Sequence, residues 1–176
     1  MTRHALTIDL PGPWTAIDPE NPFPAGTDPE TVLEFRRVGL VPDLPSVPDV
    51  TPVLMGRLTV PPGPEPGSDP ILATLSIIEG RPEHRVTVDE SEPGVIEPIK
   101  TTWRSTIAWP EGVGDVTLHH VRYTFPSPTG DTLYAAEFAT PNLMIVEGME
   151  AYFEAVMAGV AFVEILEVGE SSGQDG

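Results

Sequence analysis

Proline is the residue that most restricts how this chain can fold. The sequence has 22 prolines in 176 residues, and 15 of them lie between Pro11 and Pro70. Proline has no backbone N–H, so it removes a hydrogen bond from a helix or a central strand. The two densest runs, PDLPSVPDVTP (42–52) and PPGPEPGSDP (61–70), are therefore predicted to be loops on either side of a strand at VLMGRLTV (53–60). Neither run has the regular basic-flanked PxxP spacing of a polyproline ligand.

Short alternating or β-branched segments predict that strands dominate the rest of the chain. The segments VTLHHVRYTF (116–125) and TLYAAEFAT (132–140) flank PSPTGD, which has the Pro and Gly of a turn. We expect these two strands to pair as an antiparallel hairpin. Further strands are expected at HALTIDL (4–10), ILATLSIIE (71–79) and HRVTV (84–88), with a closing strand at AFVEILEV (161–168).

One helix is clear from its apolar spacing. Within residues 147–158, positions three and four apart are apolar, as on one face of a helix, and the same face continues to Val160. A second helix is expected to begin at Asp28, with Pro29 at its first position. The predicted fold is α+β, a twisted antiparallel β-sheet with flanking helices. It forms one domain over residues 1–168, followed by a polar tail at 169–176.

The adjacent histidines His119 and His120 raise the question of a metal or catalytic site. Neighbouring side chains on a strand point to opposite faces, so these two are poorly placed to bind one ion. The face with His119 also carries Val121, Tyr123 and Phe125 and is predicted to face the core. His120 is predicted to lie near solvent beside Arg122, a cation that disfavours metal binding. We therefore expect no metal at these histidines.

Other site patterns fail when they are tested against the sequence. The acidic segment DESEPGVIEPIK (89–100) has Pro93 and Lys100 where a calcium loop needs oxygen ligands. No GxSxG, GxxxxGK[ST], GxGxxG or HExxH motif occurs. No catalytic residue and no cofactor are therefore expected. An aromatic-lined pocket stays open as an alternative, and its candidate residues are Trp103, Trp109 and Tyr123.

The charge balance is the strongest bulk property. Nine basic against 27 acidic residues give a formal net charge of −18, and there is no cysteine. Such a field repels nucleic acids and anionic membranes. No segment reaches the ~18 consecutive apolar residues of a membrane-spanning helix, so no membrane insertion is expected. The first residues do not resemble a secretory signal, so we expect a cytoplasmic protein.

Several segments together suggest a family. They are the hairpin at 121–142, the helix at 148–159, the strand at 160–166, the link from Phe138 to Pro141 (F-x-T-P) and the opening LPGPWTAID at 10–18. Over roughly residues 115–166 this arrangement resembles small actinobacterial proteins of the PsbP-like α/β/α sandwich type. The resemblance implies a twisted antiparallel sheet with packed helices, and a binding or assembly role rather than catalysis. It carries over no site residue.

The sequence therefore predicts a non-enzymatic acidic module that binds a basic protein partner, such as a toxin-neutralising (immunity) or secretion-accessory protein. The alternatives are an enzyme or small-ligand binder with an aromatic pocket, and a structural component that assembles through its helix. No basic residue follows Arg122 to neutralise the acidic stripe of the predicted helix. The candidate partner-binding residues are Glu147, Glu150 and Glu154 in that stripe, and Asp89, Glu90 and Glu92 in the acidic loop.

Overall fold

The computed structural model describes residues 3–18, 25–27, 29, 50–80, 98–108 and 114–165. Five sequence predictions lie outside these residues. They are the helix expected from Asp28, the strand expected at 84–88, the acidic loop with Asp89, Glu90 and Glu92, the indole of Trp109, and the polar tail at 169–176.

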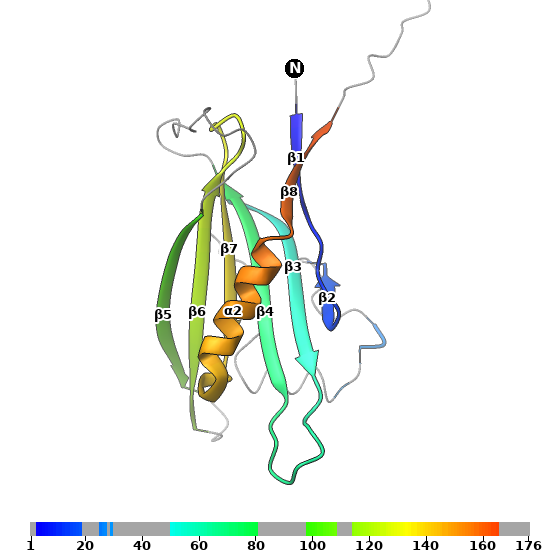
Figure 1. Ribbon diagram of the computed structural model, residues 1–176, viewed down its shortest axis with the longest axis vertical. Coiled ribbons are helices and arrows are strands. Elements are labelled where there is room, and N and C mark those ends of the chain that lie inside the picture. The colour runs from blue at the N-terminus through cyan, green and yellow to red at the C-terminus, as the bar shows by residue number, and fades with distance from the viewer. Residues whose placement is uncertain are drawn as a thin grey trace, which may run out of the picture.

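Six strands form one antiparallel sheet (Figure 1). In spatial order they are β2 (Trp14–Ile17), β3 (Val50–Val60), β4 (Ile71–Gly80), β7 (Leu133–Thr140), β6 (Asp115–Pro126) and β5 (Ile99–Ala108). The expected hairpin is confirmed, because β6 and β7 pair antiparallel and the N–H of Ser127 donates to the carbonyl of Thr132 at 2.8 Å. Gly130 turns the chain there with a φ of 70°, a conformation that glycine adopts without steric cost.

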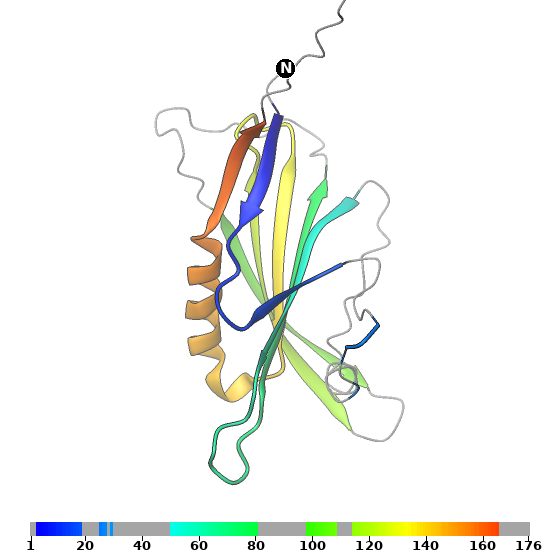
Figure 2. The same ribbon diagram turned by 90° about the vertical axis from the view of Figure 1, so that its right-hand side faces the viewer.

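A helix and a two-stranded ribbon lie against one face of this sheet, here called the inner face. The helix is α2 (Val146–Met157), preceded by the short turn η1 (Leu143–Ile145). The ribbon pairs β1 (Arg3–Ile8) with β8 (Val160–Ile165). Figure 2 shows α2 and the ribbon on the same side of the sheet, with the ribbon beyond the C-terminal end of the helix. The predicted last strand therefore exists, but it pairs with the first strand and not with the six-stranded sheet.

The hydrophobic core fills the space between the inner face and α2. The rings of Phe138 on β7 and Phe153 on α2 stack with their centroids 4.4 Å apart, and Phe153 is fully buried. The ring of Phe162 on β8 contacts those of Phe125 and Tyr134. The ribbon therefore covers the part of the core that lies beyond the C-terminal end of the helix. The predicted apolar face of the helix is confirmed, and its buried members are Met149, Phe153 and Val156.

Two strands were not expected from the sequence. The segment IKTTWRSTIA forms β5 at one edge of the sheet, and WTAI forms β2 at the other. On β2 the indole of Trp14 packs in the core against Phe138, and a Cβ on Gly56 of the neighbouring strand β3 would lie 3.3 Å from that indole. Glycine at position 56 therefore leaves room for this tryptophan.

The loop expected at 42–52 ends earlier than predicted, because β3 already begins at Val50 and includes Pro52. The reason is local. The register of β3 against β4 shifts between Pro52 and Leu54, and β2 pairs with β3 only from Met55 to Leu58. Proline is tolerated at such an irregular position, where the neighbouring strand does not need its N–H. The run at 61–70 forms the connection between β3 and β4, as expected.

The fold is thus mostly antiparallel β-sheet with one short α-helix in the described ranges. Of the helices in these ranges, none has the length and apolar character needed to cross a membrane.

Candidate functional site

The two histidines on β6 contact different groups on opposite faces of the sheet, as the strand periodicity predicted. On the inner face, Nε2 of His119 lies 2.8 Å from Oε1 of Glu150 on α2. On the outer face, which is the face away from α2, Nδ1 of His120 lies 3.2 Å from Oε1 of Glu137 on β7. The described residues contain no group of three or more acidic or histidine side chains that could hold a metal ion.

The inner face holds a cluster of charges around Lys100, the single lysine of the chain. Lys100 lies opposite Tyr123 in the pairing of β5 with β6, which brings its ammonium group beneath α2. Its Nζ is 2.8 Å from Oε2 of Glu150 and 2.7 Å from Oε1 of Glu154. These two hydrogen bonds raise the pKa of Lys100, and the bond from Lys100 lowers the pKa of Glu150.

The expectation that no base neutralises the acidic stripe of the helix is wrong. The neutralising residue comes from β5, far earlier in the chain, and it bonds to Glu150 and Glu154 together. His119 contacts the second oxygen of Glu150, so both oxygens of that carboxylate are used. Glu147 lies in the first turn of α2 and is exposed. The side chain of Glu154 keeps 56% of its surface exposed.

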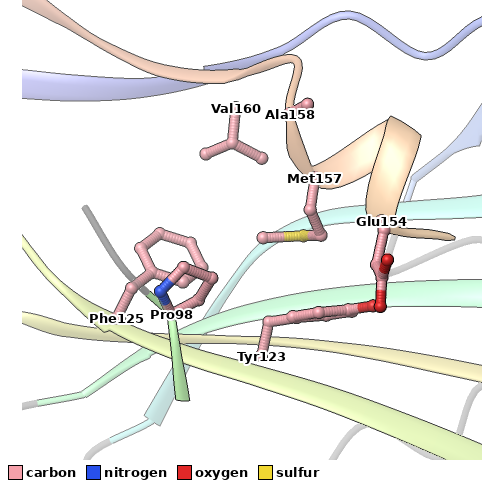
Figure 3. Close-up of a pocket in the computed structure, with 7 residues that line it drawn as sticks. All are labelled: Pro98, Tyr123, Phe125, Glu154, Met157, Ala158 and Val160. Atoms are coloured by element: carbon pink, nitrogen blue, oxygen red, sulfur yellow. The ribbon is translucent and has the colours of Figure 1, made fainter. Parts of the chain in front are cut away.

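A cavity of about 280 Å³ lies at the C-terminal end of α2. Figure 3 shows its lining side chains, with Phe125 and Pro98 on one side, Met157 and Val160 across from them, and Tyr123 running along the floor toward Glu154. The walls are therefore mostly apolar, with polar groups at one end. The buried hydroxyl of Tyr123 has no hydrogen-bond partner among the described residues. Burial raises the pKa of Tyr123 to about 12, so the hydroxyl keeps its proton at neutral pH.

The outer face carries a polar and aromatic network on β5, β6 and β7. The indole of Trp103 stacks on the ring of His120 with centroids 4.8 Å apart, and the guanidinium of Arg122 lies 4.9 Å from the centre of the same indole. Arg122 donates to Oε2 of Glu137 at 2.6 Å. Oγ of Ser105 lies 2.7 Å from Nε2 of His120. His120 is thus less exposed than the sequence suggested, because Trp103 covers its ring.

The contacts Ser105–His120–Glu137 follow the order of a nucleophile, a base and an orienting carboxylate. Burial raises the pKa of Glu137, but hydrogen bonds from His120 and Arg122 outweigh this effect and leave the pKa below its ordinary value. The carboxylate therefore stays ionised and shared between a histidine and an arginine. An acyl-transfer site also needs hydrogen-bond donors for an oxyanion and a substrate pocket. The cavity described above lies on the other face of the sheet, under α2.

The sequence predictions of site residues have mixed outcomes. Tyr123 does line a cavity, whereas Trp103 belongs to the outer-face network and Trp109 lies outside the described residues. Lys100, Ser105 and Glu137 were missed as contact residues. If residues 99–108 had been recognised as a strand, the alternation of side chains would have indicated that Lys100 and Trp103 point to opposite faces. Nothing in the sequence indicates that Glu137 meets His120, because this contact depends on the pairing of β6 with β7.

Comparison of the chain with known protein families, curated proteins and solved structures finds no match.

Proposed function

We propose that this chain is a non-enzymatic acidic module that binds a basic protein partner. The observation that carries the proposal is the net charge of −18. Among the side chains that the structure describes, twelve are acidic and only four are basic. The negative field is therefore largely uncompensated and attracts a cationic surface.

The partner site proposed on α2 is centred on Glu147 and Glu154. Glu147 is exposed, and Glu154 is more than half exposed although it bonds to Lys100. Glu150 contributes less, because Lys100 and His119 occupy its two oxygens. Asp89, Glu90 and Glu92 stay candidates from the sequence. The resemblance to PsbP-like proteins supports a binding role, and a toxin-neutralising or secretion-accessory protein is the proposed kind.

We propose a structural role for the Ser105–His120–Glu137 contacts. Three features support it. Arg122 occupies the second oxygen of Glu137, Trp103 covers the imidazole of His120, and all of these residues lie on regular strands of one sheet. Such cross-strand pairs stabilise a sheet without catalysing a reaction.

The first experiment is copurification of the intact protein with its partner from the native host, followed by measurement of association rates with the isolated partner. We expect a basic protein whose association slows at least about tenfold between roughly 0.05 M and 0.5 M NaCl, because salt screens exposed charges. An association rate that does not change with salt would contradict the proposal.

Charge reversal locates the site. Glu147→Lys changes an exposed charge on α2, while Glu164→Lys makes the same change on β8. We expect Glu147→Lys to slow association more than Glu164→Lys, with melting temperatures close to that of the unmodified protein. Reversal at Glu150 is a poor probe, because it would also break the contacts with Lys100 and His119. Equal slowing by the two variants would contradict a site on α2.

A further inference from the structure

The short turn η1 exposes two large apolar side chains at the N-terminal end of α2. Met144 keeps 97% of its surface exposed and Ile145 keeps 43%, and no residue of η1 is buried. Single exposed apolar residues are common on protein surfaces, but neighbouring ones that form a patch mark sites of contact with other molecules. Methionine is also enriched at protein interfaces, because its flexible thioether adapts to the shape of a partner.

Hydrogen bonds fix the base of this turn, so an ordered backbone presents Met144. The side-chain nitrogen of Asn142 donates to the carbonyl of Pro70 at 2.9 Å, and its side-chain oxygen accepts from the N–H of Leu72 at 2.8 Å. The hydroxyl of Thr140 donates to the carbonyl of Leu72 at 2.7 Å. A surface that is ordered before binding loses less conformational entropy when a partner docks.

The same bonds tie η1 to the connection between β3 and β4, residues 61–70. Figures 1 and 2 show this connection extending beyond the sheet at the end of the molecule where α2 begins. The N–H of Ser68 donates to the carbonyl of Glu65 at 3.1 Å. Gly67 follows Pro66 with a φ of 86°, as at the third position of a type II turn. The connection is therefore a second ordered segment, and its exposed prolines are Pro61, Pro62, Pro64 and Pro66.

The turn η1, the connection at 61–70 and Glu147 together form the end surface, which carries charge of one sign. Its acidic residues Glu65, Asp69 and Glu147 are all exposed, and the segments 61–70 and 141–149 contain no basic residue. In a chain with a net charge of −18, these acids repel a second copy of the same surface, a nucleic acid and an anionic membrane. The occupant that complements the end surface is therefore a positively charged protein.

We propose that the end surface is where the basic partner docks, and that Met144 enters an apolar pocket of the partner that is flanked by lysine or arginine. The inference rests on the proposed function and extends its site from Glu147 to η1 and the β3–β4 connection. The acids and the methionine have different tasks. Exposed charges speed the approach of a cationic partner, whereas a buried apolar anchor slows its departure.

Site-specific photo-cross-linking in the native host tests the location. A diazirine amino acid replaces Met144 of the intact protein, and in a matched control it replaces Val163, which is 50% exposed on the ribbon. Figure 1 shows the ribbon at the opposite end of the molecule. We expect irradiation to attach a protein of basic isoelectric point at position 144 and not at position 163. No adduct at position 144, the same adduct at both positions, or an acidic protein at position 144 would overturn the proposal.

Dissociation rates measured with the isolated cross-linked protein test the role of the anchor. We expect Met144→Ser to speed dissociation at least about tenfold, as removal of a central contact residue does, and Val163→Ser to leave it unchanged. Because Met144 is 97% exposed, its replacement should not alter the melting temperature. Equal dissociation rates for Met144→Ser and the unmodified protein would overturn the inference. A salt-dependent association rate in that same experiment would leave the proposed function standing, so the two failures are distinguishable.

Discussion

At the scale of single residues, Lys100 connects the edge strand β5 to the helix through two carboxylates. We expect Lys100→Met to lower the free energy of unfolding at pH 7 by about 1 kcal/mol, the upper part of the range for partly exposed ion pairs. The sign of the pH dependence follows from Glu150, whose pKa is lowered by Lys100 in the folded state. The stabilisation by the Lys100–Glu150 pair is fully present above the pKa that Glu150 has in the unfolded chain. It disappears as the pH falls through the lower pKa that Glu150 has in the folded protein.

Urea titrations of both proteins between about pH 7 and pH 3 check this expectation, because that range spans the titration of ordinary carboxylates. The stability difference between the protein and Lys100→Met should be constant near neutral pH and should shrink in the acid range. A difference that persists unchanged at the acid end would mean that Lys100 stabilises through its aliphatic stem.

A second prediction at this scale concerns the reactivity of Ser105. If its contact with His120 is structural, a fluorophosphonate probe should not label the protein, and Ser105→Ala should fold with a stability within about 1.5 kcal/mol of the original, the usual value of one hydrogen bond. Intact-mass spectrometry after exposure to the probe gives the answer, with a serine esterase as positive control. A stoichiometric adduct on Ser105 would show that the outer-face network activates a nucleophile.

At the scale of elements, the packing of α2 depends on Phe153. Its ring is fully buried and stacked on Phe138. We expect Phe153→Ala to cost roughly 3–5 kcal/mol, because the change removes a large buried side chain and leaves a cavity. A denaturant titration measures the loss. Ala155→Gln, at an exposed position of the same helix, is the matched control and should stay within about 0.5 kcal/mol. A loss below about 1 kcal/mol for Phe153→Ala would mean that this face of α2 is not packed.

The elements that could be predicted are those with strong local patterns. The helix, the β6–β7 hairpin and β4 have apolar spacing that identifies them without knowledge of their neighbours. The edge strand β5 was missed because neither face is continuously apolar: Thr101 and Ser105 interrupt the apolar positions in IKTTWRSTIA. The opposite faces of His119 and His120 followed from strand periodicity alone. The contacts of Lys100 with α2 and of Ser105 with His120 depend on strand register and helix placement, which no local pattern encodes.

At the scale of the whole molecule, the net charge of −18 opposes the compact state through self-repulsion. Salt weakens this repulsion, but it also weakens the ion pairs of Lys100 and Arg122. Acidic side chains outnumber basic ones three to one among the twelve and four that the structure describes, so repulsion should dominate. We expect the melting temperature to rise by a few degrees between about 0.02 M and 0.5 M NaCl, since ~1 kcal/mol corresponds to roughly 2–4 °C for a chain of this size.

Thermal unfolding followed by circular dichroism measures this shift, and Lys100→Met provides the internal comparison. Without the lysine the chain is still more negative, and the favourable pairs with Glu150 and Glu154 are gone. Salt should therefore raise the melting temperature of the variant more than that of the original protein. A melting temperature that falls with salt in both proteins would mean that attraction within the few ion pairs outweighs repulsion among the many acids, and would weaken the case for a strong field that steers a basic partner.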